Sequence, residues 1–261
     1  YLAEYHYMMK INKDKRIGSV IFVVEGKKTE PRIIRDIFLK VLGYSVYQYN
    51  KQEDIIRLKA NNDEYNKVVI ITNNKPQLAY VLNTANDFLD NAFKRLNEYN
   101  LDAYNSAIYY IFDRDYESNS NETITKLINT LSNSRDNDYN PNGLLLISYP
   151  CIEAFYLNAN NDNHSFKNGK EIKKYVNEKK YKTIKETSII NAYKALINIL
   201  KEKFSVDSLI DNLDDFKNVG KQILNNEDKY YQSNNKFITL SLLAIAFLDL
   251  GIIEDENNNI N

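Results

Sequence analysis

Two acidic groups in this chain have the residue types and spacing that metal-dependent chemistry needs. The first is Glu25, which is followed by Gly26 directly after the apolar run 19–24. The second is the pair Asp113 and Asp115 in the string YIFDRDYE. Residues i and i+2 of an extended chain point to the same side, so these two carboxylates repel each other unless a cation lies between them. The spacing therefore predicts a site for a hard divalent ion, Mg²⁺ or Mn²⁺.

Each acidic group also has a simpler explanation when it is taken alone. A Glu-Gly pair after a strand commonly forms only a turn, and an Asp-x-Asp pair commonly lies in an exposed acidic loop. Together, at two strand ends of one chain, they favour a functional site. A nucleotide-binding P-loop is not predicted, because Gly26-Lys27 is followed by Lys28 where that motif has Ser or Thr, and because Gly18 is too far upstream.

The composition restricts the other kinds of site. The 261 residues include one cysteine and two histidines, which argues against a structural zinc site, an internal disulfide and a Ser-His or Cys-His nucleophile. The net charge of -1 excludes a globally basic nucleic-acid binder but not a local basic patch. The first 16 residues lack a signal-peptide pattern, and a single cysteine suits a reducing compartment, so a cytoplasmic protein is expected.

The elements that must position these acids alternate along the first part of the chain. Short β-branched runs predict strands, and the stretches between them predict helices. The predicted strands are 19–24, 44–49, 67–72, 107–112 and 143–148, and the predicted helices are 31–42, 76–99, 122–131 and 150–157. This order predicts an α/β fold with a mostly parallel sheet flanked by helices. Ligands bind at the carboxyl ends of strands in such sheets, so Glu25 and Asp113 are expected at one edge.

The residue pattern changes at about residue 165, after which no further strands are predicted. Apolar residues recur at helical spacing over 189–204, and residues 237–250 are apolar on all sides. The second run is too short to span a membrane, so it predicts a buried core helix, and no membrane partner is expected. We therefore expect a catalytic domain over 16–160 and a helical C-terminal region over 165–254.

Three strings, VVEGKKTEP, YIFDRDYE and SYPCIEAFYL, together resemble the Toprim domain. They are most similar to the RloB-like, AbiLii-type Toprim proteins of abortive-infection systems against phage, and less closely to the AriB nuclease of the PARIS system. The resemblance covers about residues 18–160. It implies a Toprim-like sheet and a Mg²⁺-dependent nuclease that acts on DNA or RNA, tRNA included, as a toxic effector. It also implies control by an ABC-type ATPase encoded nearby.

The same resemblance implies roles for individual residues. Glu25, Asp113 and Asp115 match the catalytic and metal-binding acids of the family. Glu30 matches the second glutamate of an EGxxTE pattern, and Glu153 matches a later acidic position near the metal. Two alternatives remain open from the residues alone. Glu30 could instead favour a helix N-terminus through its charge, and Glu153 could be a buried structural acid.

Basic residues near these acids suggest a surface for nucleic acid. A lysine-dense segment with interleaved tyrosines runs over 166–186. Its lysines could neutralise phosphates and its tyrosines could stack on bases, although the glutamates among them also fit a solvated helix face. The candidate nucleic-acid-binding residues are Lys27, Lys28, Lys173, Lys174, Lys179 and Lys180.

A second class of function has to be kept beside the nuclease. A Toprim fold could serve as a non-catalytic interaction or regulatory subunit of an ATPase defence complex. The complete set of acids favours the enzyme. The apolar segments 189–204 and 237–250 are then expected to mediate homodimer formation or docking onto the ATPase, unless they only complete the core. Of the neighbouring residues, Arg114 is expected to form a salt bridge and Cys151 to be a small apolar filler.

Overall fold

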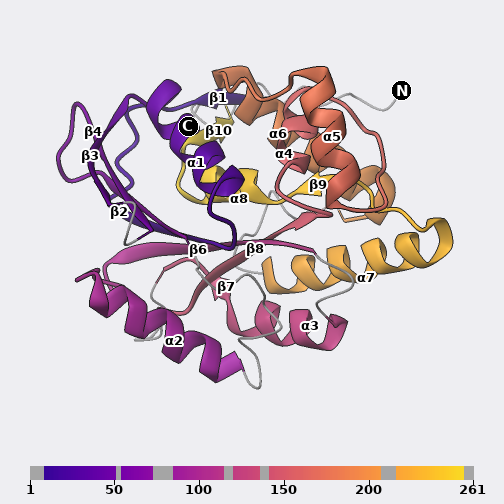
Figure 1. The fold of residues 1–261 in the computed structure, drawn as a ribbon, viewed down its shortest axis with the longest axis horizontal. Helices are drawn as coiled ribbons and strands as arrows, with labels where there is room; N and C mark the ends of the chain where they lie inside the picture. Colours follow the sequence, from indigo (N-terminus) through magenta and orange to yellow (C-terminus); the bar gives the residue numbers. More distant parts are fainter. Residues whose placement is uncertain are drawn as a thin grey trace.

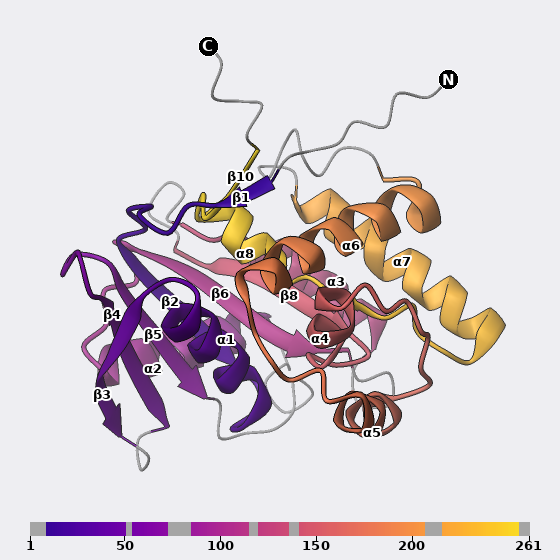
Figure 2. The ribbon, with the colours of Figure 1, turned by 90° about the horizontal axis from the view of Figure 1, so that it is seen from above.

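The computed structural model describes residues 9–50, 54–72, 85–114, 120–135, 141–206 and 216–255. Within them the chain forms an α/β fold in which an eight-stranded sheet lies between two layers of helices (Figures 1 and 2). The strands of this sheet are β2 (Ser19–Val24), β3 (Tyr44–Asn50), β4 (Ile55–Ala60), β5 (Lys67–Thr72), β6 (Ser106–Asp113), β7 (Ser132–Asn133), β8 (Gly143–Tyr149) and β9 (Leu240–Ser241).

The sheet is mixed, with a parallel centre. Strands β5, β2, β6 and β8 are parallel neighbours in that order. Strands β3 and β4 are added antiparallel on one side, and β7 and β9 pair antiparallel with β8. The expectation of a mostly parallel sheet therefore holds only for the centre. Strand β4 was not predicted, because Arg57 and Lys59 interrupt its apolar pattern.

All five predicted strands are present, and their ends differ from the predicted ones by at most one residue. Strands β2, β6 and β8 are buried along almost their whole length. Parallel strands covered by helices on both faces read as continuous apolar runs, which is why the sequence identified them well.

The helices cover the two faces of the sheet unequally (Figures 1 and 2). One layer contains α1 (Thr29–Lys40), α4 (Ala154–Ala159), α5 (Gly169–Lys179), α6 (Glu186–Phe204) and α8 (Leu243–Asp249). The other contains α2 (Ala85–Glu98), α3 (Asn121–Thr130) and α7 (Phe216–Asn234). Of the helix predicted over 76–99, the part before residue 85 lies outside the described residues.

Two predicted helices differ from the structure. The segment 237–250 is not one helix but strand β9 followed by α8. The buried Asn158 side chain accepts the Ser241 N–H at 3.0 Å and donates to the Thr239 carbonyl at 3.0 Å, which holds this stretch extended. The helix predicted from residue 150 begins only at Ala154, and the Ile152 N–H in the turn before it donates to an Asp113 carboxylate oxygen.

Residues from both predicted parts of the chain contribute to one hydrophobic core. Ile189, Tyr193 and Leu196 of α6 are buried, and so is almost all of α8. The expectation that segments 189–204 and 237–250 offer apolar surface for docking was therefore wrong, because they complete the core. A two-stranded sheet also pairs β1 (Met9–Ile11) with β10 (Ile253–Asp255). The division into 16–160 and 165–254 stays a prediction.

No helix within the described ranges is long and apolar enough to cross a membrane.

Candidate active site

Glu25 and Asp113 lie side by side at the carboxyl ends of the neighbouring parallel strands β2 and β6. The Glu25 N–H donates to the Ile111 carbonyl at 3.3 Å, which continues the ladder between the strands. The Glu25 carboxylate accepts the Asp113 N–H at 3.2 Å. The structure thus brings together the two acids that the sequence placed at one sheet edge. Asp115 lies outside the described residues.

Glu30 belongs to the first turn of α1 and folds back over the turn that follows β2. Its side chain is buried, and an added Cβ at Gly26 would overlap its carboxylate. A side chain at position 26 would therefore displace this carboxylate from its present place. Burial raises the pKa of Glu30, and the negative charge of Glu153 adds to the rise. The charge of Glu30 in turn raises the pKa of Asp113, so Glu30 lies near the other acids as well as at the helix N-terminus.

Glu153 reaches the same place from the residue that precedes α4. It is only 3% exposed, and its Oε2 has no hydrogen-bond partner among the described residues. The Lys173 ammonium on α5 lies 3.9 Å from that oxygen. Burial alone would lower the pKa of Lys173, but the charge of Glu153 and its neighbours raises it overall. A buried acid thus faces a cation supplied by the C-terminal region.

Asp113 experiences the charges of all the other acids. Burial raises its pKa well above the ordinary value, and the charges of Glu30, Glu25 and Glu153 raise it further. A hydrogen bond at 2.8 Å from the Ile152 N–H to Oδ1 opposes this rise only in part. Carboxylates at the ends of β2 and β6, in α1 and directly before α4 therefore lie close together, and their mutual repulsion favours a bound cation or proton.

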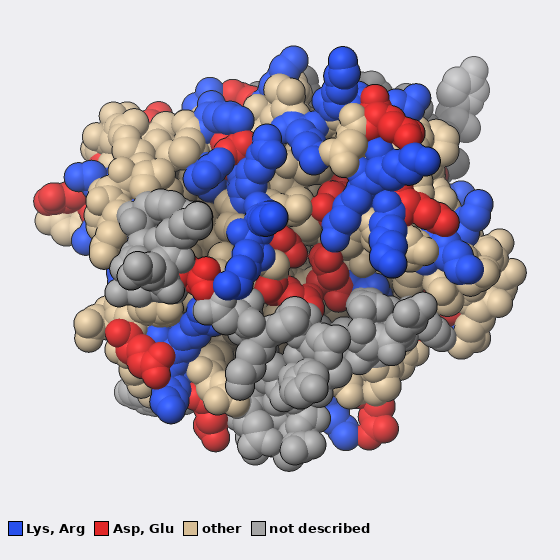
Figure 3. All heavy atoms as spheres, viewed as in Figure 1, with Lys and Arg blue, Asp and Glu red and all other residues tan. Residues whose placement is uncertain are grey.

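A cleft of about 480 Å³ opens beside these acids. Its lining residues are Gly26, Lys27, Lys28, Thr29, Glu30, Glu153, Lys173, Asn177 and Lys182. Figure 3 shows acidic side chains gathered in a depression near the middle of this face, with lysine and arginine side chains around part of its border. An acidic floor with a basic border suits a polyanion that is bound through a cation.

The predicted nucleic-acid-binding lysines fall into two groups. Lys27, Lys28 and Lys173 line the cleft, whereas Lys174, Lys179 and Lys180 are exposed on α5 or at its end and do not line it. Lys182 lines the cleft but was not among the candidates. It belongs to the lysine-dense segment, and only the end of α5 at residue 179 directs it towards the acids.

Arg114 anchors the chain directly after Asp113. It is 1% exposed, and its Nη2 lies 3.5 Å from Asp228 Oδ1 on α7 and donates to Asn121 Oδ1 at 2.6 Å. Its backbone N–H donates to the Ser148 carbonyl at 2.8 Å. The predicted salt bridge is confirmed, and it ties the end of β6 to the helices on the opposite face of the sheet.

Cys151 is free and buried beside the acids. Burial raises the pKa of its thiol well above the ordinary value, and the charges of Asp113 and Glu153 add to the rise. The nucleophilic thiolate is thereby disfavoured, in line with a packing role.

The donor set fits a hard divalent cation in chemistry and charge. All converging side chains offer carboxylate oxygens, and Glu153 Oε2 has no donor to satisfy it. Within the described part of the chain, however, no three His, Cys, Asp or Glu side chains are arranged as a ready metal site. An ion here would draw the carboxylates together, and Asp115 is a further candidate ligand by sequence.

No family model matches the chain, and searches of curated proteins and of solved structures found no match.

Proposed function

We propose that this chain is a nuclease that hydrolyses phosphodiester bonds of DNA or RNA with the help of Mg²⁺ or Mn²⁺. Carboxylates from four separate segments lie close together, and two of them, Glu30 and Glu153, line a lysine-bordered cleft; this arrangement carries the proposal. Phosphodiester hydrolysis combines a cation-binding centre with a surface for a polyanion. The resemblance of the three strings to RloB-like Toprim proteins supports the same activity and suggests a role in abortive infection.

In this proposal Glu25, Glu30, Asp113 and Glu153 hold the cation, together with Asp115. Bound Mg²⁺ would stabilise charge on the phosphate oxygens and lower the pKa of a bound water. The chain fixes the acids before any substrate arrives. Glu25 is held by the Asp113 N–H, and Asp113 is held by the Ile152 N–H.

The lysines at the border of the cleft bind the substrate backbone in this proposal. Two of these lysines come from distant parts of the chain. Lys28 lines the cleft from the turn before α1, and Lys182 lines it from the segment after α5. The Lys173 ammonium lies 3.9 Å from Glu153, so it would orient the phosphate nearest to the acids. The Lys27 ammonium forms an ion pair with Asp54, 3.3 Å away, so it is less available to a phosphate.

A cleavage panel tests the proposal. The full chain is incubated with single-stranded DNA, duplex DNA, tRNA and other RNA, each in Mg²⁺, Mn²⁺ or EDTA. We expect cleavage of at least one substrate in Mg²⁺ or Mn²⁺ and none in EDTA, because the acids need a cation to approach a phosphate. Undiminished cleavage in EDTA, or intact substrates under every condition, contradicts a metal-dependent nuclease.

A non-catalytic subunit of an ATPase complex is the alternative. The converging carboxylates disfavour it, since several like charges packed together destabilise a fold and are commonly kept where they serve a site. Control by an ABC-type ATPase remains part of the proposal on the strength of the resemblance, and no apolar surface is assigned to it.

Gly26→Ala provides a test of the turn that positions Glu30. The added methyl group displaces the Glu30 carboxylate from the other acids, so Mn²⁺ affinity is expected to fall roughly tenfold while the fold is kept. Isothermal titration calorimetry measures the affinity. Glu30→Gln should show a similar loss, and the double variant should lose little more, because both changes remove the same ligand.

Gly169→Ala is the matched control for this substitution. A Cβ at Gly169 meets Cys151 Sγ at an ordinary 3.4 Å, so Mn²⁺ affinity is expected to stay unchanged. Equal Mn²⁺ affinity in Gly26→Ala and wild type, or losses that add fully in the double variant, would show that the turn does not place Glu30.

A further inference from the structure

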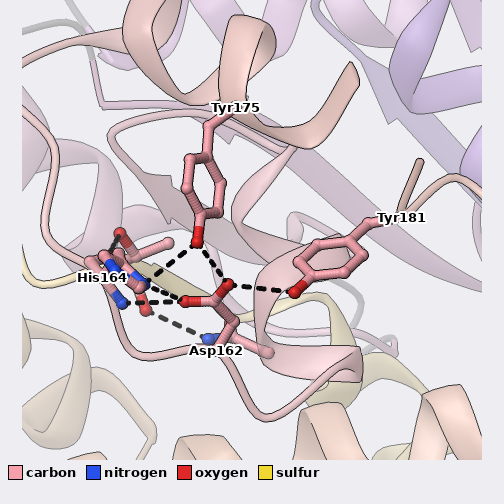
Figure 4. Close-up of polar contacts among 6 residues, drawn as sticks. Asp162, His164, Tyr175 and Tyr181 are labelled. Carbon is pink, nitrogen blue, oxygen red and sulfur yellow. Dashed lines mark hydrogen bonds and ion pairs between the residues drawn. The ribbon is translucent and has the colours of Figure 1, made fainter. Parts of the chain in front are cut away.

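Three aromatic rings meet at a single carboxylate next to α5 (Figure 4). The Tyr175 hydroxyl donates to Asp162 Oδ2 at 2.9 Å, and the Tyr181 hydroxyl donates to the same oxygen at 3.2 Å. The His164 ring contacts the other oxygen through Nδ1. Burial alone would raise the pKa of Asp162, but hydrogen bonds from His164 and Tyr175 lower it overall, so it is a charged acceptor. The polar ends of the rings are thus satisfied inside the protein.

Two of these rings remain available at a surface hollow of about 450 Å³. The His164 side chain is 65% exposed, and Tyr181 lines the hollow, whereas Tyr175 packs against Phe166 with ring centroids 5.2 Å apart. The complete lining is Asn160, Asn161, Asp162, Asn163, His164 and Tyr181. Flat rings beside side-chain amides, which carry both donors and acceptors, suit a flat polar ligand such as a nucleobase.

The hollow lies next to the acidic cleft, and the C-terminal end of α5 separates the two. Lys182 lines the cleft, while its neighbour Tyr181 lines the hollow. Lys179 and Lys180 are exposed at this end of α5. A helix is about 10–12 Å across with its side chains, so a short stretch of one polynucleotide strand can reach over the end of α5.

We propose that the hollow is a base-binding subsite for single-stranded nucleic acid, which holds an unpaired base near the phosphodiester in the cleft. The inference rests on the proposed nuclease function, because the cleft supplies the reason for a polynucleotide to bind here. Paired and stacked bases in a duplex do not expose their faces to the rings. The substrate is therefore a single strand, or a loop or end with unpaired bases, and Lys179 and Lys180 contact its phosphates.

The test uses binding to the full chain in the Asp113→Asn background, so that substrate is not consumed. Fluorescence anisotropy in Mg²⁺ compares a labelled single-stranded oligonucleotide with an abasic strand of equal length. Tyr181→Leu is expected to weaken binding of the base-bearing strand roughly tenfold, the scale of one lost stacking contact, and to leave abasic binding unchanged. Tyr181→Phe keeps the ring and is expected to bind as tightly as its parent.

Two further variants separate bases from phosphates. Lys173→Ala in the cleft is expected to weaken both strands alike, and Tyr65→Leu, which removes a tyrosine that is 79% exposed elsewhere, is expected to weaken neither. Equal losses on both strands in Tyr181→Leu, or no loss at all, overturn the base-binding subsite. The nuclease proposal is judged separately by cleavage in the wild-type chain. If the wild-type chain cleaves a substrate but Tyr181→Leu binds both strands as its parent does, only the base-binding subsite is refuted.

Discussion

Asp113→Asn is expected to lower metal-dependent cleavage at least about a thousandfold, equal to roughly 4 kcal/mol of transition-state stabilisation. The change removes one negative charge where four acids converge and leaves too little charge to hold the cation next to a phosphate. Asparagine has the same shape, and its Oδ1 can still accept the Ile152 N–H, so the fold is expected to persist. Single-turnover cleavage with excess protein measures the chemical step directly.

Glu25→Gln should have an effect of the same order, because Glu25 lies beside Asp113 at the end of β2. The control is Glu122→Gln, which removes an exposed acid that pairs only with Lys126 on α3, 2.7 Å away, and should leave the rate unchanged. Cleavage at the wild-type rate by either Asp113→Asn or Glu25→Gln would refute the proposed site, whatever substrate is used.

The same Asp113→Asn variant is expected to be more stable than the wild type when no metal is present. Burial and the charges of Glu30, Glu25 and Glu153 raise the pKa of Asp113 in the folded protein. Such an acid stabilises the folded state at pH values below the pKa that it has in the unfolded chain. This stability is lost as the pH rises through the pKa that it has in the folded protein. As the pH rises above the unfolded pKa, the metal-free wild type therefore loses stability that the asparagine variant keeps. We expect a midpoint at least about 3 °C higher, since roughly 1 kcal/mol shifts a chain of this size by about 2–4 °C.

A pH series of thermal unfolding in EDTA measures this difference. The midpoints of the two proteins should agree near pH 4, close to the unfolded pKa of aspartate, and diverge as the pH rises. Added Mg²⁺ at neutral pH should reduce the difference, because it binds the folded wild type more tightly than the variant. A gap that is independent of pH, or a wild type that is more stable throughout in EDTA, would contradict the charge repulsion. Glu122→Gln should give no gain, since the hydrogen bond from Lys126 lowers the pKa of Glu122.

Local signals in the sequence predict several elements of the fold correctly. The central predicted strands β2, β6 and β8 are apolar runs covered on both faces, and this burial makes them readable as continuous apolar segments. The place of Glu25 and Asp113 followed from the same signals, because parallel neighbouring strands end at one edge of a sheet. The glycine at position 26 was visible in the sequence, but its close approach to the Glu30 carboxylate was not.

Other features depend on contacts between distant parts of the chain, and these are visible only in the folded structure. The buried Asn158 turned a predicted helix at Ser241 into a strand, against a strongly apolar local pattern. Lys173 came to face Glu153 because α5 packs beside α4, a pairing that no local spacing encodes. The meeting of Tyr175 and Tyr181 at Asp162 has the same origin. Propensity and periodicity act within a few residues, whereas hydrogen bonds and charges act wherever the packed chain brings their groups together.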